Sequence, residues 1–128
     1  MVGRQNLLLV PDPKADLNRA DELVSRALAL DPNCARAHSL KGAIPSFKKG
    51  RLNESLAEYE RALSLDPAMV NAVLGLGWDN LYLGQFEKSL EYFDKAIRLS
   101  PHDPYVGVSY RGEAASQFGL KRYDQTIE

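Results

Sequence analysis

A seven-residue motif returns three times along the chain at an almost constant interval, and it limits the possible folds more than any other feature. RALALDP at 26–32, RALSLDP at 61–67 and KAIRLSP at 95–101 end in prolines separated by 35 and then 34 residues. Each motif closes a stretch with apolar residues at helical spacing, and each proline cannot continue the helix before it. A fixed period of this length is typical of helical repeat arrays, in which each unit contacts only its neighbours.

The stretch at 69–101 shows how one unit is built. Gly77 removes side-chain bulk where two helices must approach closely, and Gly84 can adopt the left-handed conformation that ends the first helix. Phe86 and Phe93 lie seven residues apart on one face of the following helix, where they can fill the space between helices. The pattern predicts a helix, a turn at the second glycine and an antiparallel second helix.

This stretch resembles a tetratricopeptide repeat, which is a pair of antiparallel helices with a period of 34 residues. It departs from the family pattern at Asn80, where a packed aromatic is usual, and at Ser89, where alanine is usual. At Asn80 we expect a structural hydrogen bond. The stretch at 34–67 is a second match, carried by Gly42, Gly50, Leu52, Leu56, Tyr59 and Ala62. The resemblance implies an all-α fold, a right-handed α–α superhelix (solenoid) of about three repeats with incomplete ends.

We expect a single array over 13–128, after an irregular N-terminal segment at 1–12. Its parts are listed in order: a lone second helix at 13–31, repeats at 35–66 and 69–100, and a truncated repeat at 104–128. In the truncated repeat we expect a first helix that ends near Phe118, and a further helix that begins around Tyr123 and Ile127.

Pro45 falls inside the first helix of the repeat at 35–66, and the interval from Gly42 to Gly50 is one residue longer than its counterpart in the next repeat. A proline inside a helix loses a hydrogen bond and clashes with the preceding turn. We therefore expect a kink or π-bulge around 44–47. Such a bulge is either functional or a local adaptation to the inserted residue.

Charge and cysteine content disfavour several classes of protein. Lys and Arg total 16 against 17 Asp and Glu, so the net charge of −1 would not attract nucleic acid or an anionic membrane. The apolar run at 7–10 is too short for a signal-peptide core or a spanning helix. Cys34 is the only cysteine, which excludes an internal disulfide and favours a cytoplasmic location.

No arrangement of residues in the sequence predicts catalysis. The metalloprotease motif HExxH, the phosphate-binding motif GxxxxGK[ST] and paired CxxC motifs do not occur. Gly75 and Gly77 begin like a dinucleotide-binding loop, but the third glycine is missing and the stretch reads as helix. His38 and His102 have no partners at metal-ligand spacing. We therefore expect neither enzyme activity nor a cofactor nor a bound metal.

The resemblance implies that the first helices of the repeats line a concave groove. On a helical wheel, the residues not needed for packing are Arg36, Ser39, Asn71, Leu74, Trp78, Tyr82, Arg111 and Phe118. Trp78 and Tyr82, four residues apart, would form an amphipathic aromatic patch for an extended peptide or a partner helix. Arg111 could add a contact to a carboxylate. The alternative is that Trp78 simply packs within the array.

Some members of the family hold the C-terminal carboxylate of chaperones through a lysine–asparagine clamp on successive first helices. The matching positions here hold Ser39, Ala43, Leu74 and Trp78, and only Arg111 is basic. A role as a chaperone co-factor is therefore disfavoured.

Two functions remain open at this point. One is a protein–protein interaction scaffold that binds a peptide or a partner helix in the groove. The other is an accessory or self-association module of a larger signalling protein, because incomplete ends leave apolar faces that a second copy could cover. The sequence at 95–105 is similar to the C-terminal repeat regions of some proteobacterial class III adenylate cyclases. This resemblance implies that the larger protein is a bacterial signalling protein.

Overall fold

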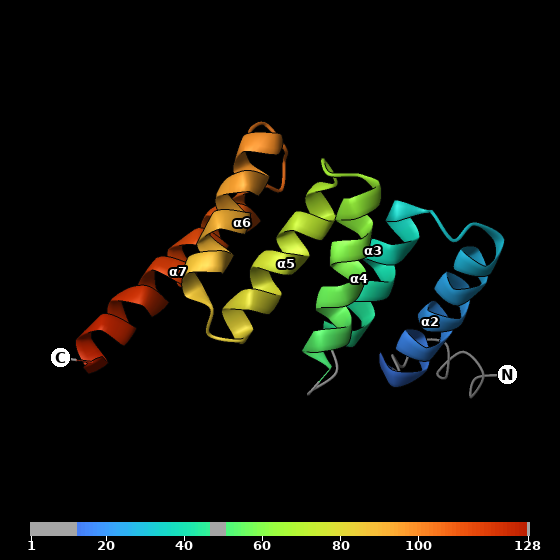
Figure 1. Ribbon diagram of the computed structural model, residues 1–128, viewed down its shortest axis with the longest axis horizontal. Coiled ribbons are helices and arrows are strands. Elements are labelled where there is room, and N and C mark those ends of the chain that lie inside the picture. Colours follow the sequence, from blue (N-terminus) through green and yellow to red (C-terminus); the bar gives the residue numbers. More distant parts are fainter. Residues whose placement is uncertain (1–12, 47–50, 128) are drawn as a thin grey trace, which may run out of the picture.

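The computed structural model describes residues 13–46 and 51–127, and these form six α-helices and no strand. The helices are α2 (Pro13–Leu30), α3 (Ala35–Ser46), α4 (Leu52–Leu65), α5 (Val70–Tyr82), α6 (Phe86–Leu99) and α7 (Val106–Ile127). Figure 1 shows them following one another in chain order across the molecule, with α2 and α7 at opposite ends.

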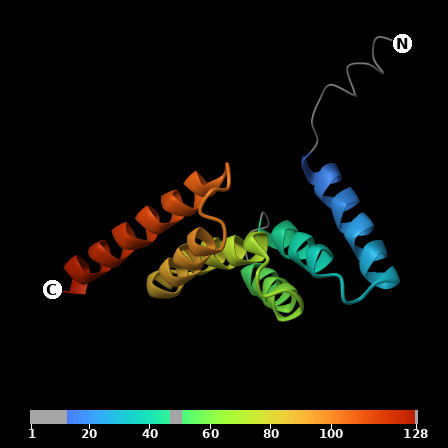
Figure 2. The ribbon, with the colours of Figure 1, turned by 90° about the horizontal axis from the view of Figure 1, so that it is seen from above.

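The helices pack as a one-dimensional array. Each packs on its neighbours in the chain, and α5 also contacts both α3 and α7. We call α3, α5 and α7 the first helices and α2, α4 and α6 the second helices. Viewed from above in Figure 2, α2 and α7 rise at the two ends of the row formed by the other helices. The predicted all-α solenoid is confirmed, whereas the division of the chain into one domain stays a prediction.

The repeated motif ends α2 and α4 in the same way. The backbone N–H groups of Asp31 and Asp66 donate to carbonyls four residues earlier, at 2.9 and 2.8 Å. Their carboxylates then accept from the N–H groups of Asn33 and Ala68, at 3.2 and 3.1 Å. This local turn competes with further helix, and the proline after each aspartate cannot extend it. At the other end of a repeat, Gly84 takes a φ of +78° and ends α5, as expected.

The core is built from aromatic rings of the second helices that lie against glycines of the first helices. A Cβ on Gly42 or Gly75 would lie 3.0 or 2.2 Å from the ring of Tyr59. The ring of Phe93 lies in the same way between Gly77 and Gly112, at 2.9 and 2.3 Å. Each ring therefore contacts the first helix before it and the one after it, which confirms the close approach expected at Gly77.

Polar groups in the core have partners. The amide of Asn80, which is buried, donates to the carbonyl of Leu76 at 2.7 Å, so the expected structural hydrogen bond is confirmed. Tyr92 of α6 packs against the core cluster around Tyr59, and its burial, with smaller contributions from Glu60 and Glu91, raises the pKa of its phenol.

The prediction of a π-bulge near Pro45 is wrong for the described residues 44–46. They are α-helical, and Ser46 is the last described residue of α3. Pro45 lacks the N–H that would donate to the carbonyl four residues earlier, but the residues around it keep α-helical geometry despite that one missing bond. The kink, which was the other form of the prediction, stays a prediction. Phe47, which the prediction also included, lies outside the described residues.

The predicted break after Phe118 is also wrong, since α7 continues as one helix to Ile127. Gly119 is not a helix terminator: a Cβ there would lie 2.5 Å from the ring of Phe86, so its role is close packing. Among the described glycines only Gly84 has a positive φ.

A shift in register explains why α7 does not break. Tyr59 and Phe93 are 34 residues apart, but the glycines that receive them from the following helices, Gly75 and Gly112, are 37 apart. The connection at 100–105 has six residues and the one at 66–69 has four, so it accounts for two of the three residues of the shift. The residue of α7 that corresponds to Gly84 is therefore Lys121, which does not favour the left-handed turn.

Candidate functional site

A pocket of about 390 Å³ lies among the first helices. Residues of α3, α5 and α7 line it together with one ring of α4; they are Ala43, Tyr59, Gly75, Trp78, Asp79, Tyr82 and Arg111. Three of the predicted groove residues, Trp78, Tyr82 and Arg111, are thus brought to one place.

Trp78 is the centre of this group. Its half-buried ring meets the ring of Phe93 edge-on, with centroids 5.0 Å apart and an interplanar angle of 74°. The ring of Tyr82 lies 6.3 Å away at 30°, and 64% of Tyr82 is exposed. The two alternatives for Trp78 are therefore not exclusive, because one part of its ring packs in the core while another lines the pocket.

Arg111 reaches Trp78 from the next first helix. Its guanidinium carbon lies 5.3 Å from the centroid of the indole, within the range of a cation–π contact. No carboxylate in the part of the chain that the structure describes forms an ion pair with Arg111. Its donors stay available for the carboxylate contact that the sequence predicted, which remains a prediction.

Asp79 is a pocket residue that the sequence analysis missed. It is 1% exposed and hydrogen-bonds to the hydroxyl of Ser55 on α4, which also lies 2.7 Å from the carbonyl of Gly42. The available signal was its spacing, since Asp79 follows Ala72 by seven residues on the buried face of α5. A carboxylate on such a face has to be satisfied by neighbours in the array.

The other predicted site residues lie elsewhere. Arg36, Ser39 and Asn71 line a second pocket of about 230 Å³ between α3 and α5. The expectation that Ser39 lies open in the groove is wrong, since it is only 6% exposed; its neighbours in the stack cover it.

Leu74 and Phe118 are also separate from the Trp78 pocket. Leu74 is half-buried and lines a third pocket of about 130 Å³, together with residues of α6 and α7. Phe118 is exposed on α7 and lines none of these three pockets, because the register shift of α7 turns it away from the position that the sequence period predicted.

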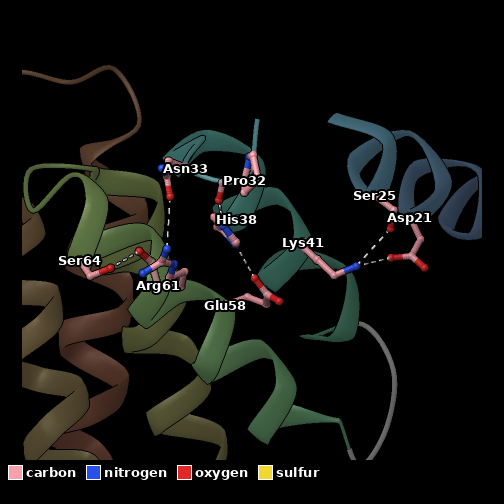
Figure 3. A network of polar contacts seen from close by, with 9 residues as sticks. All are labelled: Asp21, Ser25, Pro32, Asn33, His38, Lys41, Glu58, Arg61 and Ser64. Atoms are coloured by element: carbon pink, nitrogen blue, oxygen red, sulfur yellow. Dashed lines mark hydrogen bonds and ion pairs between the residues drawn. The ribbon is translucent and has the colours of Figure 1, made fainter. Parts of the chain in front are cut away.

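His38 has no partners at metal-ligand spacing in the sequence, but in the structure both of its ring nitrogens have polar partners. Its Nδ1 lies 2.8 Å from a carboxylate oxygen of Glu58, and its Nε2 lies 2.8 Å from the carbonyl of Pro32 (Figure 3). Glu58 of α4 turns toward α3 at this contact. Both residues connect helices and do not belong to the pocket.

Figure 3 also shows polar contacts between α2 and α3. The ammonium of Lys41 lies 3.2 Å from the hydroxyl of Ser25 and 3.6 Å from a carboxylate oxygen of Asp21. These contacts tie α2 to α3.

Within the described ranges, no three His, Cys, Asp or Glu side chains gather in a way that could hold a metal ion. No described helix combines the length and the apolar character needed to cross a bilayer.

The helices and their contacts define a solenoid of paired α-helices. Residues 47–104 match the family model described as Tetratricopeptide repeat, and the fold is that of a tetratricopeptide-repeat solenoid. The Sgt2 TPR domain from Aspergillus fumigatus superposes with a TM-score of 0.77 at 19% identity, covering 90% of this chain and 75% of that one. The TPR2B-domain:pHsp70 complex of yeast Sti1 gives 0.70 at 18% identity, covering 85% and 86%.

One relative with higher identity is the Protein CTR9 homolog of Arabidopsis thaliana. It is 36% identical over 102 residues, which are 78% of this chain. The chain spans only 9% of the length of that relative. The similarity therefore concerns a short part of a much larger protein.

Proposed function

We propose that this chain is a protein–protein interaction scaffold that binds a peptide or a partner helix on the surface formed by α3, α5 and α7. The observation that carries the proposal is the grouping of Trp78, Tyr82 and Arg111 around a pocket of about 390 Å³. The tetratricopeptide fold is typical of protein–protein interaction, and the matched family model supports this class of function.

The geometry of Trp78 suits a binding anchor. Its contacts with Phe93 and Arg111 hold the ring in place before a partner arrives, so little side-chain entropy is lost on binding. Tryptophan and arginine are the residue types that most often dominate the energy of an interface. Tyr82 extends the same surface outward and adds an apolar ring with a polar tip.

The chemistry of the surface disfavours a chaperone-tail ligand. The yeast Sti1 domain above is a complex with pHsp70, but the clamp positions of this chain hold Ser39, Ala43 and Leu74. Of these, Ser39 is buried and the other two have no polar side-chain group. A partner that places an apolar side chain against Trp78 and an acidic group near Arg111 fits these residues better.

The test is a comparison of peptide affinities. Peptides are selected from a display library on the wild-type chain, and their Kd values are then measured by calorimetry for two variants. We expect Trp78→Ala to weaken binding by roughly 30-fold or more, as for an interface hot spot. Tyr110→Ala, which removes an exposed aromatic of α7 outside the pocket, is expected to bind like the wild type.

The proposal is rejected if peptides bind Trp78→Ala as well as they bind the wild type while the variant keeps its helical circular dichroism. It is equally rejected if Tyr110→Ala is the variant that loses binding, because the site would then lie on the end of the array.

A cytoplasmic location and an accessory role in a larger protein belong to the proposal as well. They rest on the single cysteine and on the short span of the matched relative. The similarity to adenylate cyclases contributes nothing to it, since the matches described above point to other proteins.

A further inference from the structure

Charged side chains are divided unevenly between the two kinds of helix. The exposed carboxylates of α4 and α6, which are second helices, are Glu54, Glu60, Glu87, Glu91 and Asp94. The described side chains of the first helices include two carboxylates, and neither is exposed. Asp79 is buried in α5, and Glu113 is half-buried in α7. The surface formed by α3, α5 and α7 therefore carries no exposed negative charge among the side chains that the structure describes.

Two arginines stand on this surface instead. Arg36 is exposed on α3 and Arg111 is exposed on α7. Neither forms an ion pair with a carboxylate in the described part of the chain. Lys41, which also lies on α3, differs because it is paired with Asp21 of α2 at 3.6 Å. A guanidinium group binds a carboxylate through two parallel hydrogen bonds, so both arginines are suited to an acidic ligand.

The two arginines belong to neighbouring pockets along the line where α3 and α5 meet. Arg36 lines the pocket of about 230 Å³ together with Asn71, and Arg111 lines the pocket of about 390 Å³. Residues of α3 and α5 line both pockets. Gly75, in the larger pocket, stands one helical turn after Asn71 on α5. One extended ligand can therefore occupy both pockets.

The larger pocket favours an apolar group in its interior and an acidic group outside it. The rings of Trp78 and Tyr82 line the pocket, and Asp79, which is hydrogen-bonded to Ser55, forms part of its wall. A second carboxylate beside Asp79 would be unfavourable, because a like charge nearby disfavours the ionised form. A carboxylate next to the exposed Arg111 meets the opposite charge instead.

The geometry of α5 gives the spacing of the acidic groups. Trp78 stands seven residues after Asn71, which is about 10 Å along the helix axis. An extended chain advances about 3.3 Å per residue, so about three residues of ligand cover the distance from the pocket of Arg36 to the ring of Trp78. Arg111 lies at that ring, with its guanidinium carbon 5.3 Å from the centroid. An acidic residue for Arg111 therefore stands next to the apolar residue.

We propose that this surface binds an extended acidic segment of a partner protein, with one apolar side chain in the Trp78 pocket and carboxylates at Arg36 and Arg111. The inference rests on the proposed function, because it assigns the chemistry of the ligand that the same surface binds. Side-chain carboxylates meet both arginines, so the segment needs no free carboxyl terminus. The carboxylates of α4 and α6 leave this surface as the one that an acidic segment approaches without repulsion.

The experiment begins with the display selection on the wild-type chain. A random library of short peptides is fused to the display protein through the carboxyl termini, so that no terminal carboxylate takes part. We expect the selected peptides, compared with the unselected library, to be enriched in a pair of acidic residues. One stands about three positions from an apolar residue and the other next to it, in either chain direction.

Double-mutant cycles then assign each acidic residue to its arginine. A selected peptide is synthesised with an amidated carboxyl terminus, and each acidic residue is changed in turn to its amide. We expect Arg36→Gln and Arg111→Gln each to weaken binding by roughly threefold to tenfold. Each loss is expected to vanish when the peptide lacks the acidic residue that faces that arginine.

The matched control is Arg98→Gln, at an exposed arginine of α6 outside both pockets. It makes the same change of charge, and we expect it to bind like the wild type. Because all three arginines are exposed, the variants are expected to keep the helical circular dichroism of the wild type.

Three results would overturn the inference while the proposed function stands. They are selected peptides that depend on Trp78 but lack the acidic pair, a pair that stands about seven positions apart and so marks a bound helix, and losses in the arginine variants that are the same whichever acidic residue is removed. A library that yields no peptide dependent on Trp78 rejects both proposals, so the two failures are distinguishable.

Discussion

A Cβ added at Gly75 would lie 2.2 Å from the ring of Tyr59, whereas one added at Gly107 would meet nothing within 4 Å. Gly75 lies inside α5, where glycine costs about 1 kcal/mol relative to alanine, and Gly107 lies in the first turn of α7. Their surroundings differ most, since only Gly75 faces a buried ring. At the scale of the residue, the spacing between successive repeats is therefore set by the absence of a methyl group opposite an aromatic ring.

The variant Gly75→Ala is expected to lower the free energy of unfolding by about 1–3 kcal/mol, because the ring of Tyr59 is buried between two helices and has little room to move. Gly107→Ala is the matched control, and we expect it to leave the stability unchanged or raise it by up to about 1 kcal/mol. Urea unfolding followed by circular dichroism measures both. Equal stability of the two variants would mean that Tyr59 does not hold the helices apart.

At the scale of the element, the helices are joined by a few polar contacts besides their apolar faces. His38 of α3 is the clearest case, since one ring nitrogen faces Glu58 of α4 and the other faces the carbonyl of Pro32 in the turn before α3. One side chain thus fixes the start of α3 against two other parts of the chain (Figure 3).

Removing this contact with His38→Ala is expected to cost about 1–2 kcal/mol of unfolding free energy. This is below the full value of a hydrogen bond to a charged group, because the side chain of Glu58 is 27% exposed. His102→Ala, at an exposed histidine, is expected to change the stability by less than about 0.5 kcal/mol. Thermal and urea unfolding of the two variants would contradict this account if both lost stability equally.

The helices also show how much of the fold can be predicted from the sequence. Positions of the helices in the two complete repeats follow from the motif, because each motif proline, and Gly84 after α5, ends a helix for a local reason. The register of α7 does not, because the longer connection at 100–105 is invisible when the period is counted between prolines. For that reason a break was expected near Phe118, and Phe118 was placed in the groove.

The residues that line the pocket could likewise be predicted only in part. Trp78 and Tyr82 could be paired from their spacing on one helix, but Arg111 and Asp79 join them only through the stacking of three helices. A helical wheel of one helix cannot show which neighbouring helix covers a residue. The wheel placed Ser39 in the groove, for example, but Ser39 is buried in the structure.

At the scale of the whole molecule, the fold is a row in which every helix depends on its neighbours. The central helices α4 and α5 pack on helices at both sides, while α2 packs only on α3 among the described helices. In such arrays stability is approximately a sum of terms from single repeats and from the interfaces between them. The ends are therefore expected to open more readily than the centre.

Hydrogen exchange followed by mass spectrometry tests this gradient. We expect the amides of α2 to exchange fastest and those of α4 and α5 slowest, since no residue of α2 is buried in the described structure. Uniform protection along the chain would instead show that the array unfolds as a single cooperative unit.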